Sequence, residues 1–172
     1  SFPTKFFDLD RCFMITRYPT SDGHELVLIN SHMSAYDKGG TSRAQQLALL
    51  TKVMSEERAK GNYVIAGGDW NHAILGSLTL YPSIQQVPDW VAELKESDLP
   101  EGFSVVAPDN LNNVPTCRGD DIPYEKDKTY TTTVDGWIVS DNVIATARNI
   151  DTQFAYSDHN PVLLSFTLKS KE

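Results

Sequence analysis

Polar residues that could carry out acid-base chemistry recur where a hydrophobic run of this sequence begins or ends. Three such places are Asn30-Ser31-His32, Gly68-Asp69-Trp70-Asn71 and Ser157-Asp158-His159-Asn160. Strand ends are where a rigid sheet presents acids, amides and imidazoles to a shared cleft. The pattern therefore predicts one common site, whose residue types suit the cleavage of a phosphate ester beside a metal ion.

Asp69 and Asn71 directly follow the apolar run 63–68. In an extended chain, residues two apart project from the same face, so these two side chains could act as a pair. The carboxylate could orient or deprotonate a water molecule, while the amide holds that water or a phosphate oxygen without adding negative charge. The alternative interpretation is an Asx turn that ends the strand.

Asp158 and His159 precede the apolar run 162–168, which places an acid and an imidazole at the mouth of a buried sheet. Successive side chains of a strand point to opposite faces, so His159 should take its orienting carboxylate from elsewhere. Asp135, beside Gly136, is the best candidate. The alternative is a turn or helix-capping Asp next to an exposed His.

Other polar residues carry weaker predictions. His32 follows the apolar run 26–29 and is a further imidazole at a strand end. Arg43 either lies solvated in a first helical turn or directs its planar guanidinium toward a phosphate. His24 and His72 are interpreted as solvated. The three tryptophans are interpreted as packing residues, because no basic residues interleave with them as in a base-stacking surface.

The elements that must position these residues begin with two β-rich runs, 11–18 and 25–31, which a turn-forming cluster joins into a predicted hairpin. Thr41 or Ser42 could cap a helix that extends to Gly61, since the apolar residues between them follow helical spacing. The remaining predicted elements are a buried strand over 63–68, a short helix over 88–96, an extended surface loop over 107–128, and strands over 130–134, 136–139, 143–150 and 162–168. This order predicts a mixed α/β fold in which a strand-helix-strand unit precedes mainly antiparallel strands.

Length and composition predict one globular domain over residues 1–172, with 40% hydrophobic residues. A net charge of -8 gives no basic surface for avid binding of nucleic acid or anionic membrane, but carboxylates that hold a divalent cation are compatible with a phosphate substrate. Cys12 and Cys117 lie too far apart in sequence to indicate a disulfide framework or structural zinc. The first ten residues resemble no signal peptide, and the chain opens on Ser1 as a processed product would; localisation is left open.

Taken in order, Asn30-Ser31-His32, Gly68-Asp69-Trp70-Asn71, Asp135-Gly136-Trp137 and Ser157-Asp158-His159-Asn160-Pro161-Val162 closely resemble the motifs of the endonuclease/exonuclease/phosphatase superfamily, the deoxyribonuclease I-like group. Its members include nucleases, sphingomyelinases and inositol-polyphosphate phosphatases. The resemblance implies the C-terminal part of a two-sheet, four-layer α/β sandwich with mostly antiparallel strands. It also implies a divalent-metal phosphoesterase site between the two sheets.

The resemblance implies a role for each matching residue. Asp69 would orient or deprotonate the attacking water, and Asn71 would help to hold water and phosphate. His159 would stabilise the developing phosphorane-like charge, while Asp135 would hold its tautomer and keep the imidazole protonated. Asp158 would bind the metal, with Asp69 and Asn71 as further ligands. The metal would be Mg²⁺, with Mn²⁺ or Ca²⁺ as alternatives. The matching side chains that would contact the substrate phosphate are His32, Asn71 and His159. Arg43 is a further candidate from its place in the first helical turn, not from the resemblance.

The chain departs from the family pattern in three ways. Trp70 stands where the family usually has Phe, and Gly136 stands where an aromatic residue is usual. The family also begins with another half, which carries an early Asn and a metal-binding Glu, and nothing before Arg11 matches it. The chain is therefore expected to correspond to the C-terminal half or so of a family member and to be inactive by itself. Its partners would be the missing N-terminal half or, through an exposed sheet face, another copy.

The predicted function is hydrolysis of a phosphodiester or phosphomonoester by an activated water once the domain is complete. Nucleic acid, phospholipid head groups and inositol phosphates all remain open as substrates. The alternative is a catalytically silent binding or scaffold module with the same fold. A serine hydrolase of the α/β type is disfavoured, because the sequence contains no G-x-S-x-G elbow.

Overall fold

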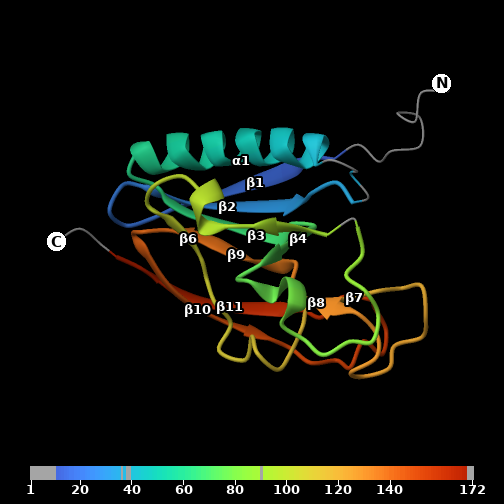
Figure 1. Cartoon of the computed structure of the whole chain (residues 1–172). Coiled ribbons are helices and arrows are strands. Elements are labelled where there is room, and N and C mark those ends of the chain that lie inside the picture. The colour runs from blue at the N-terminus through green and yellow to red at the C-terminus, as the bar shows by residue number, and fades with distance from the viewer. Residues whose placement is uncertain (1–10, 36, 38–39, 90, 170–172) are drawn as a thin grey trace.

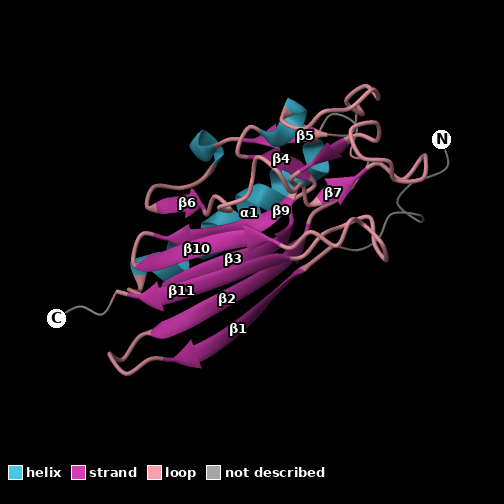
Figure 2. Ribbon diagram, turned by 90° about the horizontal axis from the view of Figure 1, so that it is seen from below, coloured by secondary structure: helices cyan, strands magenta, loops and turns pink. Residues whose placement is uncertain are grey.

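A helix and two β layers make up the protein, as the computed structural model shows for residues 11–35, 37, 40–89 and 91–169 (Figure 1). A five-stranded sheet with the order β1-β2-β3-β9-β6 lies in the middle. Helix α1 covers one face of this sheet, and the two-stranded sheet β10-β11 lies on the other side (Figures 1 and 2). The predicted mixed α/β class with mostly antiparallel strands is confirmed.

The predicted hairpin is present as β1 (Phe13–Pro19) and β2 (Glu25–His32), which pair antiparallel. β2 then pairs parallel with β3 (Tyr63–Asp69) after the crossover helix α1 (Thr41–Ala59). Parallel neighbours end at the same edge of a sheet, so the register sets His32 opposite Asp69. This strand-helix-strand unit therefore delivers the first two candidate residues to one place.

Helix α1 packs on the sheet through Leu50 and Met54, which are buried in a cluster with residues of β2 and β3. The predicted side-chain cap at Thr41 or Ser42 is wrong. Gly40 occupies the N-cap in a left-handed conformation, with φ of 68°, and has no side chain with which to cap the helix. Instead, the Asp37 carboxylate accepts the backbone N–H of Arg43 at 2.8 Å, which satisfies one free amide of the first turn.

The predicted short helix over 88–96 is also wrong. Within its described part, β5 (Ala92–Leu94) pairs parallel with β4 (His72–Ile74), and the 3₁₀ helix η3 (Glu96–Asp98) follows. Leu94 is buried while Glu93 is exposed. This alternation suits a strand, and the tertiary pairing with β4 outweighs the helix-starting signal of Pro88.

The second half of the chain supplies the remaining strands. β9 (Asp135–Ser140) pairs antiparallel with β3 and with β6 (Phe103–Val105). The predicted loop 107–128 is irregular except for β7 (Cys117–Arg118), which pairs with β8 (Thr131–Thr132). β10 (Val143–Asn149) and β11 (Val162–Leu168) form the second layer, and the 3₁₀ helix η2 (Ser77–Thr79) completes the described elements.

The space between the two β layers is filled at one end only. Tyr63, Ile65 and Val139 form a buried cluster with Val143 of β10. On the same face of the main sheet, Met14 and Tyr18 of β1 are 64% and 50% exposed. The apolar inner face near β1 is therefore uncovered by the described residues.

Two further expectations concern cysteines and membranes. Cys12 is exposed and Cys117 is buried, and both are free thiols. Among the helices of the described ranges, none combines the length and apolar character needed to span a bilayer. The expectations for the first ten residues and for Trp90 lie outside the described residues.

Candidate active site

The carboxyl ends of β2 and β3 and the start of β9 meet at one edge of the main sheet. The register sets His32 opposite Asp69, and Asp69 opposite Asp135. The His32 Nε2 atom lies 3.1 Å from an Asp69 carboxylate oxygen. Two strand pairings thus bring three of the sequence-predicted residues together.

Asp69 and Asn71 form both of the arrangements that the sequence suggested. The backbone N–H of Asn71 donates to Asp69 Oδ1 at 2.8 Å, which makes an Asx turn. Asn71 has φ of 48°, so the extended conformation stops here. The turn nevertheless brings the side chains together, because Asn71 Nδ2 donates to Asp69 Oδ2 at 3.3 Å and to the Met33 carbonyl at 2.9 Å. The amide is held by two partners and is almost fully buried.

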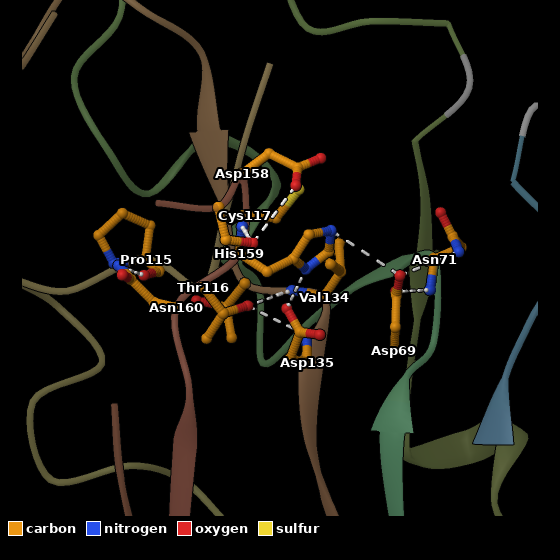
Figure 3. A network of polar contacts seen from close by, with 12 residues as sticks. Asp69, Asn71, Pro115, Thr116, Cys117, Val134, Asp135, Asp158, His159 and Asn160 are labelled. Atoms are coloured by element: carbon orange, nitrogen blue, oxygen red, sulfur yellow. Dashed lines mark hydrogen bonds and ion pairs between the residues drawn. The ribbon is translucent and has the colours of Figure 1, made fainter. Parts of the chain in front are cut away.

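His159 and Asp135 form the predicted pair (Figure 3). His159 Nδ1 lies 2.8 Å from Asp135 Oδ2, and Nε2 on the other side of the ring lies 3.9 Å from Asp69 Oδ2. The loop that carries His159 also bridges to β7, since Cys117 and His159 form an antiparallel backbone bridge. The imidazole thus lies between the carboxylates of Asp135 and Asp69.

The electrostatics of the site follow from these contacts. The hydrogen bond to Asp135, with the neighbouring Cys117 thiol, raises the pKa of His159 to about 11. The ring is therefore an imidazolium at neutral pH, with Nδ1–H donating to Asp135. Burial, followed by the negative charge of Asp135, raises the pKa of Asp69. The site thus holds a positively charged donor beside a carboxyl group of increased basicity.

A cavity of about 330 Å³ opens over this cluster. Asp69, Asn71, His32 and His159 line it together with Asp158. It is also lined by residues that the sequence analysis did not single out: Arg11, Ala35, Pro88, Cys117, Arg118, Gly119, Asp120 and Asp121. Five of these lie in the loop 107–128, whose length alone was the signal of a functional segment.

The grouping of ionisable side chains differs from the predicted metal site. Among the described residues, Asp69, Asp135 and His159 are the set whose ligand atoms all lie within 4.8 Å of one another. Asp158, the predicted metal ligand, lines the cavity but is exposed and does not belong to this set. The two carboxylates and the nearby Asn71 amide offer the oxygen ligands that hard divalent cations prefer.

Arg43 lies behind the site instead of in solvent or facing the cavity. Its side chain is buried, with Nη1 donating to the Asn71 carbonyl at 3.0 Å and Nη2 to the Asp37 carbonyl at 3.3 Å. Burial lowers its pKa, an effect that Asp37 opposes. Both predictions for Arg43, a solvated side chain and a phosphate donor, are therefore corrected: it supports the backbone of Asn71.

Two of the remaining assignments also change. His72 is buried, its Nδ1 lies 2.7 Å from the Trp70 carbonyl, and burial lowers its pKa, so the prediction of a solvated ring is wrong. His24 is 30% exposed and packs edge-on against Tyr63. The packing role predicted for Trp70 is confirmed, since it has no exposed surface.

Comparison with known proteins identifies the fold. No protein-family model matches the chain, and a search among curated proteins finds no match. Solved structures do match. A truncated TDP2 from Caenorhabditis elegans has a TM-score of 0.57 and 18% identity, over 92% of this chain and 60% of that one. D. rerio TDP2 complexed with a single-strand DNA product gives 0.59 and 18%, over 91% and 62%. An endonuclease/exonuclease/phosphatase protein from Bacteroides vulgatus gives 0.56 and 16%, over 92% and 56%.

These matches share two features that bear on this chain. Each extends over 91% or 92% of the chain, so the fold of most of the chain is common to them. The chain, however, covers less than two thirds of each neighbour's length.

Proposed function

We propose that this chain, which has the fold of the endonuclease/exonuclease/phosphatase superfamily, carries part of the active site of a metal-dependent phosphoesterase. The observation that supports the proposal is the contact of one carboxylate, Asp69, with two imidazoles. The second of these, His159, is paired with its own carboxylate, Asp135. A base and a charged donor that line one cavity, with an acid that orients the donor, are the parts that water attack on a phosphate ester needs.

Asp69 is proposed to orient and deprotonate the attacking water. Burial and the charge of Asp135 raise its pKa, which makes its carboxylate a stronger base than a solvated aspartate. The Asn71 amide, whose Nδ2 donates to the Met33 carbonyl and to Asp69, is proposed to hold the same water through its oxygen, which accepts a hydrogen bond. Asp135 accounts for the conformation and charge of His159.

His159 is proposed to donate Nε2–H to a phosphoryl oxygen as charge develops there. Asp135 retains the proton on Nδ1, so the opposite nitrogen faces the cavity as a donor. His32, exposed at the end of β2, is positioned to donate to a second phosphate oxygen. The imidazolium next to Asp69 also balances the charge of that carboxylate.

The oxygen ligands of the site fit a divalent cation. Asp69 and Asp135 are adjacent carboxylates, and their mutual repulsion helps to raise the pKa of Asp69, which a bound cation would relieve. Asp69 and Asn71 would hold the ion, with Asp158 at the wall of the same cavity. Mg²⁺, which takes hard oxygen ligands, would supply positive charge to the phosphate. Its remaining ligands would come from water, substrate or the rest of the domain.

Nucleic acid is the substrate class that the comparisons favour, because one neighbour is described in complex with a single-strand DNA product. The net charge of -8 opposes avid binding of a long polyanion, so we propose action on a strand end or a short segment. Phospholipid head groups and inositol phosphates are the alternatives.

The uncovered inner face around Met14 and Tyr18 is proposed to pack against the rest of the domain, which completes the site.

The test compares the whole protein that contains this chain with its Asp69→Asn variant on bis(p-nitrophenyl) phosphate, p-nitrophenyl phosphate and a single-stranded oligonucleotide, each with Mg²⁺. We expect the variant to lose activity by about 10²-fold or more, which is the lower end of general-base contributions. Asp109→Asn is the control, since this exposed carboxylate pairs with Arg148 outside the cavity. Full activity of Asp69→Asn would contradict the assignment. A wild-type protein that is inert with each divalent metal would favour the silent binding module.

A further inference from the structure

Thr116 lies between Asp135 and His159, and the catalytic proposal gives it no role. Its side chain is fully buried. Its hydroxyl oxygen accepts the backbone N–H groups of both Val134 and Asp135, each at 3.0 Å (Figure 3). One side chain therefore holds the backbone at the point where β9 begins and where the Asp135 carboxylate leaves the chain.

The backbone around Thr116 holds the other partner. The Thr116 carbonyl accepts the N–H of Asn160 at 2.7 Å, and the Pro115 carbonyl accepts Asn160 Nδ2 at 2.9 Å. On the other side of His159, the N–H of Arg118 donates to the Asp158 carbonyl at 3.0 Å. The segment 115–118 thus bonds to the residues that immediately precede and follow His159.

These contacts carry a geometric consequence. Asp135 begins a strand, whereas His159 lies in an irregular segment between β10 and β11. Among the described strands, no ladder of hydrogen bonds joins the two. The Trp137 indole N–H donates to the Val162 carbonyl at 3.1 Å and links β9 to β11, while the segment 115–118 bonds directly beside both partners of the 2.8 Å contact. The Thr116 hydroxyl bonds to the backbone of Asp135, and the Thr116 carbonyl bonds to the backbone of Asn160, the residue after His159.

We propose that Thr116 is a positioning residue that sets the separation of the Asp135 carboxylate and the His159 imidazole through its hydroxyl group. The effect on turnover rests on the proposed function, but the effect on the hydrogen bond does not. A residue that serves only as core packing would depend on the shape of its side chain. A positioning residue of this kind depends on the oxygen that accepts the two N–H groups.

Two substitutions separate these roles. Thr116→Val keeps the shape and removes the acceptor, so two buried N–H groups lose their partner and the start of β9 must move. Thr116→Ser keeps the acceptor and removes a methyl group. Thr129→Val is the matched control, because Thr129 is equally buried and its hydroxyl accepts the N–H of Glu125 outside the cavity.

The measurement is the low-field proton resonance of the His159 Nδ1–H in this chain, labelled with ¹⁵N-histidine and recorded at one fixed pH. We expect Thr116→Val to shift this resonance upfield or to broaden it beyond detection, while Thr116→Ser and Thr129→Val keep it in place. If Thr116→Val does not fold, Thr116→Ala replaces it, because the smaller side chain leaves room for a water that supports the fold. An unchanged resonance in the folded valine or alanine variant overturns the proposal, as does an equal change in Thr129→Val.

The second arm uses the whole protein. If Thr116 positions the pair, Thr116→Val lowers kcat by about 10²-fold, the loss expected for a displacement of about 1 Å, with little change in KM. Thr116→Ser should retain most of the activity. A wild-type protein without phosphoesterase activity would overturn the proposed function alone, because the resonance arm still decides the role of Thr116. Equal loss of kcat in the serine and valine variants would overturn the positioning role.

Discussion

Asp69 is the residue on which the local chemistry converges. It lies within 3.1 Å of His32 and 3.9 Å of His159, and it forms an Asx turn with Asn71. Burial raises its pKa, while the neighbouring imidazolium opposes that increase. The same carboxylate therefore accepts the hydrogen bond of the backbone turn and lines the cavity. Asn at position 69 can still accept the turn hydrogen bond, so Asp69→Asn tests the catalytic role with less damage to the fold than Asp69→Ala.

The charge of His159 gives a prediction at the residue scale. Asp135→Asn keeps an acceptor for Nδ1–H but removes the negative charge, so we expect the pKa of His159 to fall from about 11 toward its ordinary value of 6.5. The check is an NMR titration of the histidine ring protons. Because the folded-state pKa is raised, the contribution of His159 to stability is full below pH 6.5 and is lost as pH rises toward 11. That high-pH loss should be smaller in Asp135→Asn. An unchanged titration of His159 would show that Asp135 does not control its charge.

At the scale of elements, a buried carboxylate joins α1 to the hairpin. Glu57, near the end of the helix, accepts hydrogen bonds from Arg17 of β1 at 2.7 and 2.9 Å. It also accepts from Lys60 and from Asn62. The Arg17 hydrogen bonds are the largest influence on Glu57 and lower its pKa to about 2, against the opposing effect of burial. This network fixes the far end of the helix whose first turn supports Asn71.

Glu57→Gln should therefore destabilise the fold by about 2 kcal/mol, because it weakens several charge-assisted hydrogen bonds at a buried position. Since the folded-state pKa of Glu57 is lowered, its contribution is present above pH 4.5 and is lost as pH falls toward 2, so the difference between wild type and variant should shrink in acid. Urea unfolding at neutral and acidic pH measures both effects. Glu56→Gln is the control, since that exposed residue has only a 3.9 Å contact with Lys52. Equal effects of the two substitutions would argue against the network.

At the scale of the whole molecule, the uncovered inner face is the main feature. Met14 and Tyr18 are exposed on β1, and Phe166 of β11 is 41% exposed. Within the part of the chain that the structure describes, β1 is also an edge strand of the main sheet. Apolar side chains beside a free sheet edge favour association with another chain. The rest of the domain, or a second copy in its absence, is the proposed cover.

This feature predicts that the chain by itself self-associates at micromolar concentration. The double substitution Met14→Lys with Tyr18→Lys should shift it toward monomer, because charge on this face opposes burial. Sedimentation velocity over a concentration series measures the change. Leu49→Lys is the control, since Leu49 is 56% exposed on α1, away from the inner face. A wild-type chain that stays monomeric throughout the series would contradict the prediction.

Sequence patterns predicted the hairpin, α1 and the buried strand before Asp69 well, because each depends on local alternation or helical spacing that neighbouring residues impose. They failed at 88–96 and at the cap of α1. At 88–96 the pairing with β4, distant in sequence, outweighs the local preference. At the start of α1 the nearby Asp37, outside the predicted cap positions, supplies the acceptor instead. Arg43 and His72 were misplaced for a related reason: polar residues are usually solvated, and only packing reveals their burial.

For the candidate site, the residue types and their order along the chain determined which side chains could act together, since acids, amides and imidazoles at strand ends limit the chemistry to a few reactions. The sequence also indicated Asp135 as the partner of His159, because adjacent strand residues cannot form that pair. Only the tertiary structure decided the distances, the pKa shifts and the hydrogen bonds of Thr116. These depend on hydrogen bonds between segments many residues apart, whose register and burial no local pattern specifies.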